Sequence, residues 1–137
     1  MIKLMIVTHS VLAEGFKESS KLFFGDKADE ITAIGLFPSD SPEILEQKIV
    51  ENIKLIDDGD GVMIFVDIFA GSPFNMVALA IDEVSVKHKI QCFTGINLPL
   101  LMEALGSCES MKLDELTKHL NEVSSETIVN LREALDI

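Results

Sequence analysis

A histidine and an aspartate stand where two apolar segments end, and together they could carry nucleophilic chemistry. His9 follows the apolar segment 2–8, and Asp67 follows the apolar run 62–66. A carboxylate that accepts a hydrogen bond from one ring nitrogen fixes the imidazole tautomer and leaves the other nitrogen with its lone pair exposed. We therefore predict that His9 acts as a nucleophile and that Asp67 orients its ring.

The residues after Asp67 have the composition of a loop that could enclose an anion. Gly71 allows the backbone to approach a ligand closely, and Ser72 followed by Pro73 predicts a helix cap and the first helical residue. Free N–H groups at this helix start, and at the start of a helix after His9, would attract an anion the size of phosphate. Neither loop contains Lys or Arg.

Hydropathy patterns predict the elements that must position these loops. Short apolar segments predict four strands, at residues 2–8, 31–37, 61–67 and 90–94. Longer patterns predict helices, which include residues 12–23, 42–56, 74–84, 98–105 and 116–135. The helix at 74–84 is apolar nearly all round, so we expect it to be deeply buried or covered by another subunit. The last helix carries an apolar seam formed by Leu116, Leu120, Val123, Ile128, Leu131 and Leu135.

This alternation predicts a doubly wound α/β fold, in which helices cover both faces of a mostly parallel sheet. In a flavodoxin-like strand order the strands at 2–8 and 61–67 are neighbours, about 4.8 Å apart. Their carboxyl ends then lie at the crevice where ligands bind in such sheets, so His9 and Asp67 should meet there.

Composition limits the classes of function. The 137 residues, 47% of them hydrophobic, suit a single domain spanning 1–137. With 11 Lys and Arg against 23 Asp and Glu, the net charge is −12, which argues against nucleic acid as a partner. Cys92 and Cys108 match no metal or redox spacing and suit a reducing compartment. No segment resembles a signal peptide or a membrane span, so we expect a cytoplasmic protein.

Other patterns have ordinary interpretations. His88 and His119 lie in charged surroundings and are expected on solvated helix faces. The acidic segment 57–61 lacks the ligand alternation of a calcium loop and predicts a helix end and a turn. The sequence contains no phosphate-binding loop of the Walker type and no nucleophile elbow of α/β-hydrolases. A flavodoxin-like module that binds a small anion or a flavin stays an alternative, although no Trp or Tyr is present to stack on a flavin ring.

Three motifs together resemble the IIA component of the mannose family of the bacterial phosphoenolpyruvate-dependent sugar phosphotransferase system. They are Val-Thr-His at 7–9, Val-Asp at 66–67 leading into Gly-Ser-Pro-Phe-Asn at 71–75, and Gly-Ile-Asn-Leu-Pro-Leu-Leu at 95–101. The resemblance implies a phosphocarrier with a flavodoxin-like sheet that forms a homodimer. It also implies an antiparallel edge strand exchanged between subunits, which we place at 107–113.

The resemblance also implies partners and roles. Phospho-HPr would donate its phosphoryl group to His9, which would pass it through Nε2 to a separate IIB component, and the membrane components IIC and IID would take part only indirectly. Asp67 would orient His9, and Thr8, Ser10, Gly71 and Ser72 would surround the phosphoryl group. No cofactor or metal is expected. A regulatory module whose phosphorylation state is sensed stays the alternative.

One residue departs from the family pattern. Members commonly have two glycines before the serine, and Ala70 stands at the first of these positions. If the backbone there has a positive φ, alanine costs on the order of 1 kcal/mol.

Overall fold

A four-stranded parallel sheet forms the centre of the fold in the computed structural model, which describes residues 1–137. Its strands lie in the order β2-β1-β3-β4, the order of flavodoxin-like sheets. They are β1 (Lys3–His9), β2 (Thr32–Leu36), β3 (Val62–Val66) and β4 (Ile90–Thr94). Each strand lies within one residue, at either end, of the segment that its sequence predicts.

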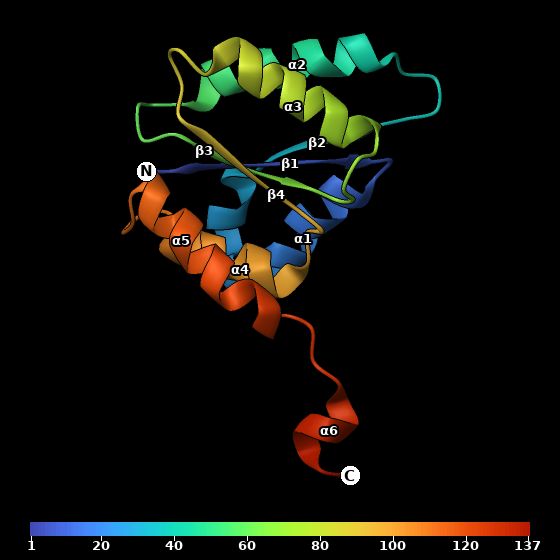
Figure 1. Ribbon diagram of the computed structural model, residues 1–137, viewed down its shortest axis with the longest axis vertical. Helices are drawn as coiled ribbons and strands as arrows, with labels where there is room; N and C mark the ends of the chain where they lie inside the picture. Colours follow the sequence, from blue (N-terminus) through green and yellow to red (C-terminus); the bar gives the residue numbers. More distant parts are fainter.

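Helices cover both faces of the sheet (Figure 1). One face packs against α2 (Pro42–Ile56) and α3 (Ser72–Val84), and the other against α1 (Leu12–Phe24), α4 (Leu98–Ser107) and α5 (Leu113–Val123). Short 3₁₀ helices at Gly25–Glu30 and Ser124–Glu126 complete the set, together with α6 (Leu131–Leu135). Because helices lie on both sides, every residue of β3 is buried.

The helix starts follow from local hydrogen bonding. The Ser41 side chain accepts from the N–H of Ile44 at 3.3 Å, and Pro42 occupies the first helical turn of α2. Asn97 caps α4 in the same way, because its side-chain oxygen accepts from the N–H of Leu100 at 2.9 Å.

The predicted antiparallel edge strand is wrong. All strand pairs are parallel, and residues 107–113 form a turn between two helices. Ser107 ends α4, and its carbonyl accepts from the N–H groups of Ser110 and Met111 at 3.1 and 3.0 Å. These bonds coil the backbone, and the buried side chains of Cys108 and Leu113 hold both ends of the turn against the core.

The last two predicted helices also differ from the observed ones. The expected helix at 116–135 ends at Val123, because the hydroxyls of Ser124 and Thr127 donate to backbone carbonyls and compete with helical bonding. Its seam is therefore split: Leu116 and Leu120 are buried, whereas Ile128 and the α6 leucines are exposed. On α3 one face is buried and Leu79 is exposed, so this chain alone does not cover the helix all round.

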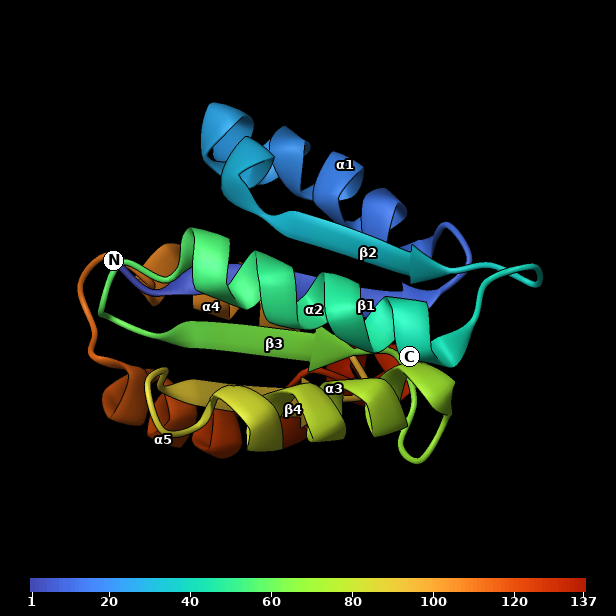
Figure 2. The ribbon, with the colours of Figure 1, turned by 90° about the horizontal axis from the view of Figure 1, so that it is seen from above.

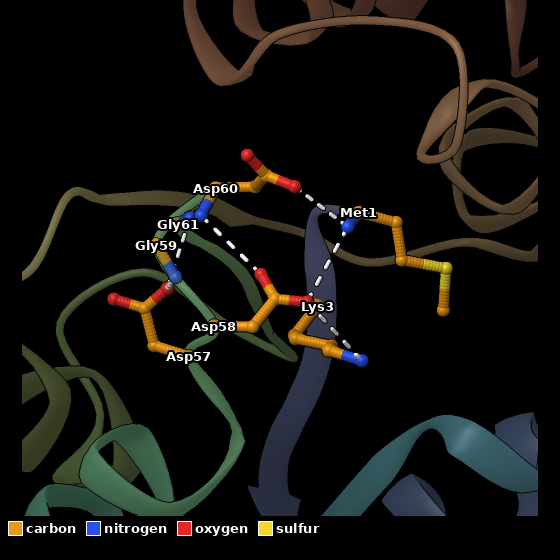
Figure 3. A network of polar contacts seen from close by, with 7 residues as sticks. All are labelled: Met1, Lys3, Asp57, Asp58, Gly59, Asp60 and Gly61. Atoms are coloured by element: carbon orange, nitrogen blue, oxygen red, sulfur yellow. Dashed lines mark hydrogen bonds and ion pairs between the residues drawn. The ribbon is translucent and has the colours of Figure 1, made fainter.

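The acidic segment 57–61 forms the predicted turn at the amino end of the sheet. One carboxylate oxygen of Asp57 accepts from the N–H groups of Gly59 and Gly61 at 2.9 and 3.0 Å, and the other lies 2.8 Å from Nδ1 of His88 (Figure 3 shows the glycine bonds). His88 is thus paired and mostly buried, which corrects its prediction as a solvated helix residue. Burial raises the pKa of Asp57, but these hydrogen bonds and His88 outweigh it and hold the pKa below its usual value.

The same turn binds the start of the chain. The Met1 ammonium group lies 2.6 Å from Asp60 and 3.4 Å from Asp58, and Lys3 reaches Asp58 at 3.8 Å (Figure 3). These contacts connect the first residues of β1 to the turn before β3, the two strands that carry His9 and Asp67 at their other ends. No helix in the structure has the length and apolar character needed to cross a membrane.

Replacing Asp57 by Asn should lower the free energy of unfolding at pH 7 by about 2 kcal/mol, because the charged acceptor of several hydrogen bonds is lost. The folded-state pKa of Asp57 is depressed, so its contribution is present above about pH 4 and disappears as the pH falls through the folded pKa. Denaturant unfolding of both proteins from pH 7 to pH 2 measures this. Exposed Asp82→Asn changes the charge equally and is the control; an equal loss at every pH would contradict the assignment.

Candidate functional site

His9 and Asp67 meet at the carboxyl ends of two adjacent strands. Val7 of β1 stands opposite Val66 of β3, so the residues that follow leave the sheet side by side. One carboxylate oxygen of Asp67 accepts from the backbone N–H of His9 at 2.9 Å and lies 2.7 Å from the ring Nδ1. The other oxygen accepts from the N–H of Ile68 at 3.0 Å. The predicted juxtaposition of His9 and Asp67 is therefore confirmed in the fold.

The charge of Asp67 fixes the tautomer of the histidine. Its side chain is only 8% exposed, and this burial raises its pKa, but hydrogen bonds from His9 and Ile68 outweigh it and lower the pKa below the usual value. An ionised carboxylate can only accept, so Nδ1 of His9 must carry the proton. In the neutral ring Nε2 then holds a lone pair, and the His9 side chain is 45% exposed.

Thr8 lies beneath the turn that carries His9. Its side chain is fully buried, and its hydroxyl oxygen accepts from the N–H of Ala13 in α1 at 2.8 Å while the hydroxyl donates to the carbonyl of His9 at 3.1 Å. The structure thus places Thr8 as a link between the end of β1 and the start of α1, and its hydroxyl does not face the exposed ring.

Ser10 continues this turn in a strained conformation and is exposed. Its φ is 51°, in the region that favours glycine, and its N–H donates to the carbonyl of Leu36 at 2.7 Å. The Ser10 carbonyl passes directly over Gly35 of β2, where a Cβ atom would lie 2.1 Å from the carbonyl oxygen. Sequence reasoning missed Gly35, although a lone glycine inside an apolar strand is a known sign of close backbone approach.

The loop after Asp67 closes against the histidine ring. A Cβ atom on Gly71 would stand 3.1 Å from Cε1 of His9, so the absence of a side chain there leaves room for the ring. Gly71 also occupies the cap position of α3, which corrects the prediction of Ser72 as the cap: Ser72 is the first helical residue and no side-chain cap bond forms. Ser72 is exposed, and the first N–H groups of α3 have no side-chain acceptor.

Ala70 has a φ of 64°, the conformation for which a glycine would be expected. The departure at this position therefore places real strain, on the order of 1 kcal/mol, in the loop beside His9. No Lys or Arg occurs in the segments 8–12, 35–41 and 67–73, so the site has no cationic side chain from its own loops. No three His, Cys, Asp or Glu side chains are grouped as a metal ion would require.

The fold and the strand order define a flavodoxin-like α/β protein with a His–Asp pair at the point where the winding direction of the sheet reverses. The family described as "PTS system fructose IIA component" (EIIA-man) matches residues 3–121. The chain belongs to this family, the mannose family of IIA components of the phosphotransferase system.

Known relatives support this family assignment. The fructose-specific EIIA component of Bacillus subtilis is 30% identical over 136 residues, which cover 99% of this chain and 90% of that protein. The mannose-specific EIIAB component of Escherichia coli K12 is 26% identical over 96% of this chain but 40% of its own length. The crystal structure of an EIIA component from Streptococcus agalactiae superposes with a TM-score of 0.87 at 26% identity, covering 97% of this chain and 99% of the other.

Replacing Ala70 by Gly should raise the free energy of unfolding by up to about 1 kcal/mol, because glycine adopts a positive φ without a steric penalty. Thermal unfolding followed by circular dichroism should show a melting temperature about 3 °C higher. Ala78→Gly, at an exposed position inside α3, is the matched control and should lose about 1 kcal/mol. A loss of stability in both variants would refute the strain at Ala70.

Proposed function

We propose that this protein is a cytoplasmic phosphocarrier that accepts a phosphoryl group from phospho-HPr on His9 and passes it to a IIB component. The family assignment supports this proposal at the level of a phosphotransferase IIA component. The observation that carries the residue assignment is the 2.7 Å contact between Nδ1 of His9 and the Asp67 carboxylate, which leaves Nε2 as the exposed nucleophile.

The chemical step needs no proton transfer. The Nε2 lone pair of His9 attacks the phosphorus of the donor phosphohistidine, a new P–N bond forms, and the donor P–N bond breaks. The donor imidazole leaves with the bonding electron pair, while Nδ1–H of His9 stays bonded to Asp67. The ring that carries the phosphoryl group is then cationic, and the adjacent carboxylate stabilises that charge. In a second attack, a histidine of IIB forms a new P–N bond as the bond between phosphorus and Nε2 of His9 breaks. The bonding electron pair returns to Nε2, so His9 is restored to its starting state.

The groups around the ring have separate tasks in this proposal. The exposed Ser72 and the open N–H groups of α3 receive the phosphoryl oxygens, and Gly71 leaves space for them beside the ring. The exposed Ser10, in the turn after His9, also contacts the phosphoryl group in this proposal. Thr8 holds that turn in place. Phosphoryl transfer depends mainly on positioning and charge stabilisation, so this arrangement requires no metal or nucleotide.

Incubation with phosphoenolpyruvate, enzyme I and HPr should place an acid-labile, base-stable phosphate on this protein. The label should be absent in His9→Ala and should form about 10- to 100-fold more slowly in Asp67→Asn, because the ring loses its charged partner. His119→Ala is the control: this histidine also contacts a carboxylate, that of Glu103 at 2.9 Å, and its loss should leave the label intact.

Transfer onward distinguishes a relay from a sensor. When a IIB component from the same organism is added, the labelled protein should transfer its phosphate to that component. Label on a serine, label that persists in His9→Ala, or failure to transfer to any such IIB component would each contradict the proposed relay.

The family resemblance further leads us to propose that the protein is a homodimer, and the C-terminal segment supports it. Ile128, Val129, Leu131, Leu135 and Ile137 are all exposed, and α6 stands away from the layers of the fold (Figure 1). Exposed apolar side chains are stabilised when a second copy of the chain covers them.

Removal of residues 124–137 should convert the dimer to a monomer, because the exposed apolar segment is lost while the core helices stay. Light scattering should give about twice 15.1 kDa for the full chain and about half of that for residues 1–123. Unchanged association after truncation would exclude the C-terminal segment as the contact, and a full chain that is monomeric at 100 µM would exclude the dimer.

A further inference from the structure

The turn between α2 and β3 contains the two Asp–Gly sequences of this chain, Asp58-Gly59 and Asp60-Gly61. It lies near the start of the chain, at the end of the sheet where the strands begin (Figure 2). An aspartate followed by glycine is prone to isomerisation, because glycine has no side chain to shield its amide nitrogen. The side chains of Asp58 and Asp60 are 48% and 63% exposed, so water reaches both.

Isomerisation begins when the amide nitrogen of the glycine attacks Cγ of the preceding aspartate. A new N–Cγ bond forms, and the amide proton and the hydroxyl of the carboxyl group leave together as water, which produces a five-membered succinimide ring. A second water molecule then opens the ring. Breakage of the N–Cγ bond restores aspartate, whereas breakage of the bond from nitrogen to the main-chain carbonyl carbon gives isoaspartate. One water is lost and one is gained, and no group is oxidised or reduced.

A single carboxylate oxygen holds both of the nitrogens that would attack. Oδ1 of Asp57 accepts from the N–H of Gly59 at 2.9 Å and from the N–H of Gly61 at 3.0 Å (Figure 3). Each nitrogen must break a hydrogen bond to a charged acceptor before it can react, and such bonds are stronger than those between neutral groups. The other oxygen of Asp57 lies 2.8 Å from Nδ1 of His88, and this contact fixes the carboxylate in place.

We propose that Asp57 protects this turn from isomerisation, and that Asp58 and Asp60 are the positions where the chain forms isoaspartate once that protection is lost. Isoaspartate adds one carbon atom to the main chain directly before β3. Because β3 is buried and is paired on both sides, the turn itself has to take up the added length. The bonds of Asp57 thus preserve the covalent structure of the turn as well as its shape.

Asp57→Ala tests this protection. During incubation at pH 7, well below the melting temperature of each variant, isoaspartate should form about tenfold faster in this variant than in the wild type, because each glycine nitrogen loses its charged acceptor. Methyl transfer by an isoaspartyl methyltransferase measures the isoaspartate, and peptide mapping by mass spectrometry should locate it at positions 58 and 60. Isoaspartate that maps elsewhere in the chain would overturn the assigned site.

His88→Ala is the matched control. It removes the contact on the other oxygen of Asp57 and loosens the same turn, but it leaves the acceptor of both glycine N–H groups in place. Its rate of isoaspartate formation should stay close to that of the wild type. A rise equal to that of Asp57→Ala would show that a less stable turn is sufficient for isomerisation, and would overturn the protective role.

Two further variants complete the test. Asp57→Asn keeps an oxygen acceptor without the charge, so its rate at positions 58 and 60 should lie between those of the wild type and Asp57→Ala, and it replaces Asp57→Ala if that variant does not fold. Adding Asp58→Glu and Asp60→Glu to Asp57→Ala should abolish the signal, because the longer side chain cannot form a five-membered ring. A wild-type rate equal to that of the position 57 variants would overturn the proposal.

Discussion

The site depends on one carboxylate that holds both the backbone and the ring of the same histidine. Asp67 accepts from the His9 N–H and from its Nδ1–H, which fixes the residue at the end of β1 and the direction of its ring at once. This is possible because β1 and β3 are parallel neighbours whose ends coincide. The buried strands, the turn over Gly35 and the bond from Thr8 to α1 all serve to keep that coincidence.

A second His–Asp pair has a similar contact but different surroundings. Asp57 and His88 lie 2.8 Å apart at the opposite end of the sheet, and Asp57 also accepts backbone N–H bonds. The His88 side chain, however, is mostly enclosed, and its role there is to hold a turn. Greater exposure of the side chain, beside an open helix start, distinguishes His9 from His88.

Much of this arrangement could be predicted from the sequence, because hydropathy and strand alternation determine which loops share the carboxyl edge. The four strands and the pairing of His9 with Asp67 followed from that alone. What could not be predicted depended on tertiary detail. The role of Gly35 arises from the carbonyl of Ser10, in the turn after β1. The end of α5 at Val123 depends on hydrogen bonds of hydroxyl groups, which the periodicity of apolar residues does not show. The edge strand failed because it rested on resemblance and had no local pattern of its own.

The two hydrogen bonds that Asp67 accepts from His9 link the orientation of the imidazole ring to the position of the strand ends. One of these bonds comes from the main-chain N–H of His9. Asp67 therefore joins the ends of two central strands as well as orienting the imidazole. A substitution that frees the ring therefore also removes a hydrogen bond that joins the carboxyl ends of β1 and β3. Natural variation at Asp67 would be restrained both by the orientation of His9 and by folding. A screen that selects only heat-resistant chains, with no test of activity, would still retain this aspartate.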